Sequence, residues 1–453
     1  MMTMQLSEAA SVLQGRMSGE DVAFRGVSTD TRVPASGALF FALQGPNFDG
    51  HAFLDDARRQ GAVAAAVNHH CDSPIPQVEV KDTRLALGQL GEYWRRKFSI
   101  PVVAITGSNG KTTVRAMTES ILSGCGRALS TQGNLNNDIG LPLTLARLGP
   151  EDRFAVLEMG ANHHGEIDYL AGLAHPTIAV VTNAGPAHLE GFGDLQGVAR
   201  AKGELFARLE ADGIAVINAD DTFAPLWREL AGHCHVVDFG LDNDAAVTAD
   251  WKGDTGGSNV RIRTADGEIE VRLPLPGKHN VMNALAAGAV SMAAGADLAA
   301  VKRGLESLSA VAGRFNVYSL PGDVTLIDDT YNANPESLSA ALDVLSLADT
   351  DSWLVLGDMG ELGEAGAALH AEAGRKARAA GVTRLYALGE LAAHAAGAFD
   401  GPGGAYASLD DLLAALQADL SGPLHVLVKG SRSSRMERVV AALGGNSERG
   451  GKH

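Results

Sequence analysis

The sequence predicts an α/β protein of three domains, and three observations support this prediction. The chain has 453 residues, whereas one domain usually holds about 100 to 200. Short apolar runs alternate with helical stretches, which is typical of parallel sheets covered by helices. A glycine-containing loop joins one of these strands to a helix, as in phosphate-binding βα units. We place the domains at residues 1–97, 98–312 and 313–453.

The first domain is predicted to be a small α/β unit. Its run GALFFAL (37–43) predicts a buried strand, and HAFLDDARRQGA (51–62) predicts a helix.

The second domain begins with PVVAITGSNGKTTVRAMTESIL, a strand, a loop and a helix in succession. Further buried strands are predicted at 154–159, 177–183 and 213–219, with helical sequence between them, so we expect a parallel sheet. Residues 242–275 are rich in Gly and Asp and predict polar turns between short alternating strands. An Ala-rich helix is predicted over 283–295.

The third domain is predicted to be a Rossmann-like α/β unit. Its strand-like runs are VTLIDD, SWLVLGD, RLYALGE and LHVLVKG, each separated from the next by helical sequence.

Composition limits the classes of function. Asp and Glu exceed Lys and Arg by 54 to 37, which gives a formal charge of −17 and argues against a nucleic-acid partner. No apolar stretch predicts insertion into a membrane. The start of the chain lacks the features of a secretory signal, so we expect a cytoplasmic protein. Three distant cysteines, Cys71, Cys125 and Cys234, have no spacing that would hold zinc.

The strongest local motif is the segment TGSNGKTT between the predicted strand and helix. Backbone amides of such a loop and of a helix N-terminus bind phosphate oxygens, while a lysine adds charge and a threonine hydroxyl can reach magnesium. The motif is a shortened variant, since Ile105 stands where the usual phosphate loop has its first Gly. We predict ATP binding rather than a plain connecting turn, by Gly107, Ser108, Asn109, Gly110, Lys111, Thr112 and Thr113.

Three further residues follow predicted strands or lie on a predicted helix of this domain. Glu158 ends the run FAVLE, where a parallel sheet assembles ligand sites, although it could also be solvated or cap a helix. His188 follows the next strand and could be structural. Lys202, in ARAKGELF, could simply be an exposed lysine of a helix. The residues alone leave these alternatives open.

The segments GSNGKTT, LEMG, NAGPAHLEGFG and ARAKGELF occur in the order in which similar segments occur in the Mur ligase family, and the chain resembles that family. The resemblance implies that Glu158 and His188 bind Mg²⁺ and that Lys202 is carbamylated and binds a second Mg²⁺. It also implies catalytic roles for Lys111, His188 and Lys202.

The same resemblance extends to the nucleotide contacts of the third domain and of the Ala-rich helix. In HNVMNALAA it implies that Asn283 recognises adenine, although Asn283 could also cap the helix. It implies that Arg314 reaches the nucleotide phosphates and that Asp329 contacts the ribose. A surface arginine and a polar turn are the alternatives for these two residues.

In the first domain, VSTDTR and ALQGPNFDGHAF resemble the sugar-nucleotide loops of two branches of the family. The segments TQGNLNNDIGLPLTL, DDTYNANP, GDMGELGE and LVKGSRSSRMERVV resemble the branch that adds a dipeptide. They imply that UDP-N-acetylmuramoyl-tripeptide and D-alanyl-D-alanine are the substrates, joined through an acyl phosphate, and we expect a monomer. A polar loop, a helix cap or a basic turn remains the alternative for each implied substrate contact. The implied contacts are Ser28, Thr31, Arg32, Asn47, Asn134 and Asn137 for the sugar nucleotide, and Lys429 and Arg432, near Asp358, for the dipeptide.

Two other functions remain in competition. A sister ligase would add a single diamino acid, or glutamate to folate, and would need a carboxylate clamp for that acceptor. A non-ligase ATPase would hydrolyse nucleotide without an acceptor and would leave the first and third domains without a purpose.

Overall fold

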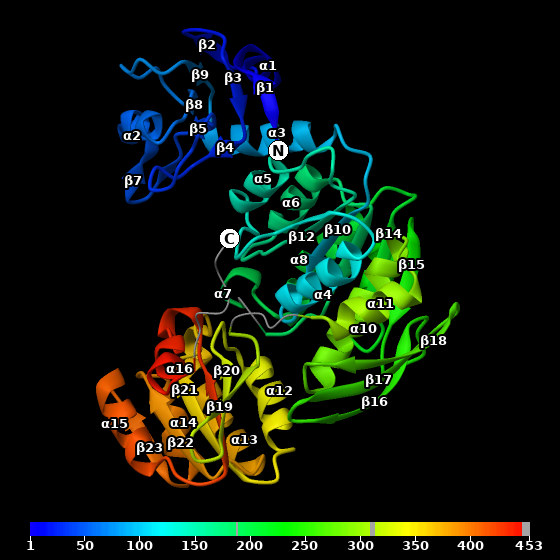
Figure 1. Cartoon of the computed structure of the whole chain (residues 1–453), viewed down its shortest axis with the longest axis vertical. Coiled ribbons are helices and arrows are strands. Elements are labelled where there is room, and N and C mark those ends of the chain that lie inside the picture. Colours follow the sequence, from blue (N-terminus) through cyan, green and yellow to red (C-terminus); the bar gives the residue numbers. More distant parts are fainter. Residues whose placement is uncertain (187–188, 309–312, 446–453) are drawn as a thin grey trace.

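Three α/β units follow one another along the long axis of the molecule in a computed structural model that describes residues 1–186, 189–308 and 313–445 (Figure 1). The first unit lies at one end, the second in the middle and the third at the other end. The predicted α/β class is confirmed. In the described part of the chain no helix is long and apolar enough to cross a membrane.

The first unit is built around a five-stranded sheet of order β2-β9-β8-β5-β4, parallel except for the β2–β9 pair. The predicted strand at 37–43 is β5, and the predicted helix at 51–62 is η1 followed by α2. The elements are β1 (Thr3–Gln5), α1 (Leu6–Val12), β2 (Arg16–Ser18), β3 (Ala23–Arg25), β4 (Val27–Ser28), β5 (Leu39–Phe41), β6 (Gln44–Gly45), β7 (Phe48–Asp49), η1 (Gly50–Phe53), α2 (Leu54–Arg59), β8 (Ala64–Val67), β9 (Gln77–Glu79) and α3 (Thr83–Arg95).

Helix α3 joins the first unit to the second. Its Leu87 and Leu90 are buried in the core of the first unit, while its other side packs against α5 and α6. Arg95, at its end, is buried and donates hydrogen bonds to the carbonyls of Ala174 (2.9 Å) and His175 (3.1 Å). These carbonyls lie at the C-terminus of α6, where a cation is favoured. The first unit is therefore tightly docked.

The second unit contains a six-stranded, wholly parallel sheet of order β11-β12-β10-β13-β14-β15. Its elements are β10 (Val102–Thr106), α4 (Lys111–Ser123), β11 (Ala128–Ser130), α5 (Gly140–Leu145), β12 (Phe154–Glu158), α6 (Glu166–Ala174), β13 (Ile178–Val181), α7 (Leu189–Phe192), α8 (Leu195–Ala207), β14 (Ile214–Asn218), α9 (Ala224–Leu230), β15 (His235–Phe239), β16 (Thr248–Asp254), β17 (Gly257–Thr264), β18 (Gly267–Leu273), α10 (Lys278–Ala293) and α11 (Leu298–Glu306).

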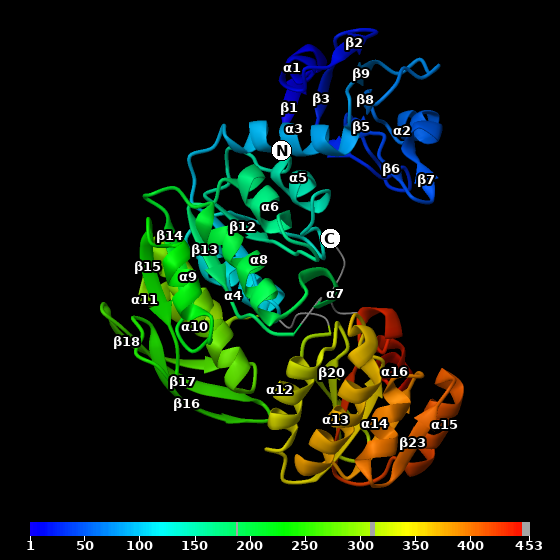
Figure 2. The ribbon, with the colours of Figure 1, turned by 180° about the vertical axis from the view of Figure 1, so that it is seen from behind.

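Helices cover both faces of this parallel sheet (Figure 2). Helices α5, α6, α8 and α9 form one core with it, and α4, α10 and α11 form the other. Strands β16, β17 and β18 make an antiparallel sheet that completes the second core, as the alternating segment 242–275 predicts. The carboxyl ends of the parallel strands meet at one edge, which is where ligands bind in such sheets.

The third unit is a six-stranded sheet of order β19-β20-β24-β21-β22-β23, parallel except at β19. Helices α12, α13 and α14 cover one face, and α15 and α16 cover the other. The elements are β19 (Asn316–Leu320), β20 (Val324–Asp329), α12 (Pro335–Leu345), β21 (Asp351–Gly357), η2 (Gly363–Ala365), α13 (Gly366–Ala379), β22 (Arg384–Leu388), α14 (Ala392–Phe399), β23 (Gly403–Tyr406), α15 (Leu409–Asp419), β24 (Leu424–Lys429), η3 (Arg432–Ser434) and α16 (Glu437–Ala442).

A buried histidine holds the loop after β21. The His370 ring, wholly buried, accepts a hydrogen bond from the Met359 amide at Nε2 (2.9 Å) and contacts the Gly366 carbonyl at Nδ1 (2.7 Å). These partners require a neutral ring, and burial lowers the pKa of His370 below its usual value of 6.5. The unfolded chain therefore binds more protons than the folded chain as the pH falls below about 6.5.

We expect the His370→Gln variant to have a flatter dependence of unfolding free energy on pH than the wild type. The wild type should lose stability by up to about 1.4 kcal/mol per pH unit through this group, between about pH 6.5 and the lowered pKa. Chemical denaturation from pH 7.5 to 5 measures the difference. His235→Gln, at an exposed histidine, is the control. Identical slopes for His370→Gln and the wild type would contradict the neutral-ring assignment.

Candidate active site

Two cavities meet at the carboxyl edge of the central sheet. The first, of about 1310 Å³, lies between all three units and is lined by Arg84, Lys111, Glu158 and Arg432 among others. The second, of about 970 Å³, lies between the central and third units. Both are lined by Asn109, Gly110 and Arg314, so the loop after β10 stands where the cavities join.

The conformation of this loop explains its glycines. Gly107 and Gly110 have φ angles of +147° and +82°, in the region that favours glycine. A Cβ atom on Gly107 would overlap Thr182 Oγ1, and one on Gly110 would overlap Asn283 Oδ1. The loop therefore lies in close contact with the end of β13 and with α10, and it has little room to move.

The loop amides do not all face the cavities. The Ser108 amide donates to the Asn183 carbonyl (3.0 Å), and the Asn109 amide donates to Asn183 Oδ1 (2.9 Å). These two amides are therefore bonded within the protein, and the predicted ATP contacts of Ser108 and Asn109 stay predictions. Helix α4 begins at Lys111, and the amides of its first turn lack intrahelical acceptors, so these are the groups available to an anion.

Lys111 folds back onto the loop. Its Nζ atom donates to the carbonyls of Gly107 (2.6 Å) and Ser108 (3.3 Å). Burial lowers the pKa of Lys111, and the positive charge of Arg314 adds to this, whereas the charge of Glu158 opposes it. Lys111 and Glu158 both line the first cavity.

Glu158 meets the requirements of a magnesium ligand. It ends β12, is 2% exposed, and accepts a hydrogen bond at Oε1 from Asn136 Nδ2 (2.9 Å). Its Oε2 is buried without a hydrogen-bond donor, 3.8 Å from Arg115 Nε. An oriented carboxylate with a free oxygen in a cavity is suited to a hard cation. Among the described residues no group of three His, Cys, Asp or Glu side chains could hold a metal, so other donors would have to contribute.

The alternative that Lys202 is an exposed lysine of a helix is wrong. It is 1% exposed, and its Nζ lies 5.7 Å from the centre of the Phe192 ring. Burial, and then the charge of Lys111, hold the pKa of the Lys202 amine well below its usual value. This lowering favours the neutral amine, which is the form that reacts with carbon dioxide. His188 lies outside the described residues, so its metal-binding and catalytic roles stay predictions.

The second cavity contains Asn283, in the interior of α10. The alternative that Asn283 caps this helix is wrong, because α10 begins at Lys278. The Asn283 amide instead donates to Asn280 Oδ1 (3.3 Å) and lies against Gly110 of the loop. His279 lines the same cavity, and burial lowers its pKa to about 4, so its ring is neutral.

The third unit brings Arg314 and Asp329 to this cavity. Arg314 donates to Thr112 Oγ1 (3.3 Å) and stacks on the Tyr331 ring, with 4.2 Å from its Cζ atom to the ring centre. Asp329 forms an ion pair with Lys429, which is 2% exposed and also donates to the Asn332 carbonyl (3.1 Å). Lys429 lines only the second cavity, so this geometry does not favour its predicted contact with the dipeptide carboxylate.

Arg432 and Asp358 were also predicted to lie near the dipeptide, and only Arg432 lines the first cavity. Arg432 lines the first cavity and contacts Glu437 Oε1 (3.3 Å). Asp358 ends up beside Lys429 on one sheet edge, since β21 and β24 are neighbours. Its Oδ1, however, accepts from the Ala392 amide (2.7 Å), so the carboxylate turns into its own domain.

The predicted sugar-nucleotide residues fall into two groups. Asn134 and Asn137 line the first cavity, and Asn137 also accepts from the Gly140 amide (2.9 Å) at the start of α5. Asn137 therefore caps the start of α5, and its position in the first cavity also allows a contact with the substrate. The remaining residues lie at the end of β4, on the loop that follows it, or in the turn between β6 and β7, and Arg32 pairs with Asp30. They are Ser28, Thr31, Arg32 and Asn47.

Several residues of the site were not predicted. Asn136 orients Glu158, and Thr182 and Asn183 hold the phosphate loop. Asn183 ends a predicted strand, so the strand-end rule could have found it. Asn136 lies between two predicted residues but has no motif of its own.

Three family models match: "Mur ligase family, catalytic domain" at residues 23–95, "Mur ligase middle domain" at 105–291 and "Mur ligase, glutamate ligase domain" at 313–432. The UDP-N-acetylmuramoyl-tripeptide–D-alanyl-D-alanine ligase of Escherichia coli K12 is 44% identical over 447 residues, covering 98% of this chain and 99% of the relative.

Solved structures are similar over nearly the whole chain. A crystal structure of MurF from Acinetobacter baumannii has a TM-score of 0.92 at 36% identity, covering 98% of this chain and 99% of that one. MurF from Thermotoga maritima in complex with ADP has a TM-score of 0.81 at 28% identity, covering 94% and 98%.

The fold and the two cavities define a nucleotide-dependent enzyme in which a phosphate loop is covered by a third domain. The chain belongs to the Mur ligase family.

Proposed function

We propose that this enzyme joins D-alanyl-D-alanine to UDP-N-acetylmuramoyl-tripeptide at the expense of ATP, with release of ADP and phosphate. The observation that carries this is the 44% identity, over 98% of the chain, to the E. coli ligase named for that reaction. The paired cavities support it, because one is built around a phosphate loop and the other is large enough for further substrates.

The reaction needs ATP because a carboxylate is a poor electrophile. A carboxylate oxygen of the tripeptide attacks the γ-phosphorus, and ADP leaves. The amine of the dipeptide then attacks the carbonyl carbon of the acyl phosphate, the bond from that carbon to the phosphate oxygen breaks, and the amine loses a proton. The enzyme contributes mainly by holding the substrates in line and by excluding water from the acyl phosphate.

The nucleotide would lie across the second cavity with its phosphates at α4. Lys111 would leave the carbonyls of Gly107 and Ser108 and donate to phosphate oxygens, where its charge offsets the charge that develops during transfer. Asn283 would contact adenine. Arg314 and Asp329 would contact phosphate and ribose from the third unit, and the Lys429 ion pair would fix the Asp329 carboxylate.

Magnesium would screen phosphate charge and polarise the γ-phosphate. Glu158 Oε2 and the Thr112 hydroxyl are the described groups that fit it, together with phosphate oxygens. We retain the predictions of a second ion, of His188 as a ligand and of a carbamate on Lys202. The burial of the Lys202 amine, which lowers its pKa and so favours its neutral form, supports the carbamate.

The sugar nucleotide would extend from the end of β4 and the turn between β6 and β7 to Asn134 and Asn137 in the first cavity. Arg432, with an exposed guanidinium on that cavity, is the better candidate for the dipeptide carboxylate than the buried Lys429. Cytoplasmic location and a monomeric state remain predictions.

The function is tested by release of phosphate from the complete reaction and from reactions that each lack one substrate. We expect release to require ATP, UDP-muramoyl tripeptide and D-alanyl-D-alanine together, with one amide bond formed per phosphate. Hydroxylamine added without the dipeptide should trap the acyl phosphate as a hydroxamate. Phosphate release that is independent of both the sugar nucleotide and the dipeptide would instead indicate a plain ATPase.

A further inference from the structure

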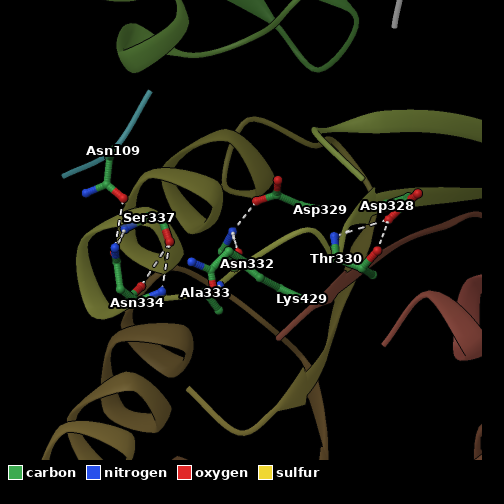
Figure 3. A network of polar contacts seen from close by, with 9 residues as sticks. All are labelled: Asn109, Asp328, Asp329, Thr330, Asn332, Ala333, Asn334, Ser337 and Lys429. Atoms are coloured by element: carbon green, nitrogen blue, oxygen red, sulfur yellow. Dashed lines mark hydrogen bonds and ion pairs between the residues drawn. The ribbon is translucent and has the colours of Figure 1, made fainter. Parts of the chain in front are cut away.

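A single side chain of the phosphate loop reaches across to the third unit with both ends of its amide. Asn109 Nδ2 donates to Glu336 Oε2 (3.0 Å), and Asn109 Oδ1 accepts from Asn334 Nδ2 (2.8 Å). Figure 3 shows Asn109 and Asn334 facing each other across this boundary. With the bond from Arg314 to Thr112, these contacts tie the third unit to one short loop.

The backbone of Asn109 is fixed by its own domain. Its amide donates to Asn183 Oδ1 (2.9 Å), and its carbonyl accepts from Thr182 Oγ1 (2.6 Å) and Asn183 Nδ2 (3.2 Å). The side chain therefore leaves the loop in a direction set by the end of β13. Among the described contacts it makes no hydrogen bond within the loop, whose proposed phosphate contacts are Lys111 and the first turn of α4.

The partner residues are equally constrained. Asn334 is the N-cap of α12, where its Oδ1 accepts from the Ser337 amide (2.8 Å) and Ser337 Oγ accepts from the Asn334 amide (3.0 Å). This reciprocal box leaves Nδ2 of Asn334 pointing at Asn109. Glu336 lies against the backbone of Gly185, where a Cβ atom would overlap its carboxylate.

The same segment carries the nucleotide contacts of the third unit. Lys429 binds both the Asp329 carboxylate and the Asn332 carbonyl, two residues before Asn334, so residues 329–337 are tied to β24 (Figure 3). A shift of α12 relative to Asn109 would therefore move Asp329 as well. Arg314 follows the same shift, since the Gly313 carbonyl accepts from the Tyr331 amide (3.1 Å).

We propose that Asn109 and Asn334 are a positioning pair that sets the register of the third unit on the phosphate loop. Neither residue touches the reacting atoms. Their amide contact, supported by Glu336, places Arg314 and Asp329 over the second cavity. The inference rests on the proposed function, because it assumes that ATP lies at this loop.

The test is a double-mutant cycle on kcat/KM for ATP. Asn109→Ala removes the amide of the loop, and Asn334→Ser keeps a helix cap while being too short to reach Asn109. Each variant should lose roughly tenfold in kcat/KM, the weight of one or two net hydrogen bonds, and the double variant should lose no more than Asn109→Ala, which already removes the contacts with Asn334 and Glu336. Glu336→Gln keeps an acceptor for Asn109 and should retain most of the activity.

Two further measurements separate positioning from folding. Ser408→Ala removes the cap of α15, far from the boundary in the same unit, and should leave kcat unchanged. Small-angle scattering with bound ADP should show a larger radius of gyration for the double variant than for the wild type. Losses of kcat/KM that multiply in the double variant would contradict the proposed positioning pair. Equal radii of gyration for the double variant and the wild type would also contradict it. An inactive wild type would instead overturn the proposed function.

Discussion

Replacing Lys111 with alanine should lower kcat by about 10²- to 10³-fold, the usual cost of removing one preorganised charge from a transition state. The residue is half-buried, and its amine bonds only to carbonyls of its own loop among the contacts described, so its loss should scarcely change the melting temperature. Phosphate release under saturating substrates measures the effect. Thermal unfolding of the same preparation shows whether the variant is folded.

A surface lysine provides the control for charge. Lys302 lies on α11 in the same domain, with an exposed side chain paired to Glu306. Lys302→Ala should have wild-type kcat. A folded Lys111→Ala enzyme that releases phosphate at close to the wild-type rate would remove the phosphate-loop assignment.

Replacing Lys202 with alanine should also lower kcat by about 10²-fold or more, because the carbamate would supply a ligand that stabilises charge during phosphoryl transfer. Small carboxylic acids should restore part of the activity by entering the space that the side chain leaves. Lys202→Met fills that space with no amine, so the same acids should not rescue it. The contrast between the two variants separates a missing carboxylate from a damaged core.

Labelled carbon dioxide tests the carbamate without any turnover. The wild type incubated with ¹³CO₂ should give a carbamate carbon resonance that is absent from both Lys202 variants. The lowered pKa of Lys202 favours the neutral amine, which is the form that adds carbon dioxide. Absence of the resonance, together with no rescue of Lys202→Ala by carboxylic acids, would contradict a carbamate on Lys202.

The sequence predicted the fold well because the signals are local. Buried strands such as 154–159 and 213–219 are continuous apolar runs, and the phosphate loop is a contiguous motif between strand and helix. Short edge strands were harder to predict. Strands β11 and β23 have only three and four residues, and their pairing depends on the neighbouring strand rather than on their own composition.

The site was predicted less completely, because side-chain environments depend on tertiary contacts. Nothing local distinguishes buried Lys202 from an exposed helix lysine, or the Lys429 ion pair from a basic turn. The cap alternative for Asn283 failed because α10 starts five residues earlier than the Ala-rich run suggested. Contacts across the domain boundary, such as that of Asn109 with Asn334, join residues too far apart in sequence for any pattern to link them.

The choice of acceptor distinguishes this enzyme from its sister ligases, and it is measured by kcat/KM for D-alanyl-D-alanine, D-alanine, L-lysine and diaminopimelate at saturating ATP and UDP-muramoyl tripeptide. A dipeptide carries a second amide, and its carboxylate lies one residue further from the reacting amine. Enzyme groups that bind the second amide and the carboxylate stay unpaired when a single amino acid is bound. This lowers kcat/KM by about ten- to a hundredfold per group. We predict that D-alanyl-D-alanine is coupled at least about tenfold better than any of the others. Equal or better coupling of lysine or diaminopimelate would contradict the account and indicate a sister ligase.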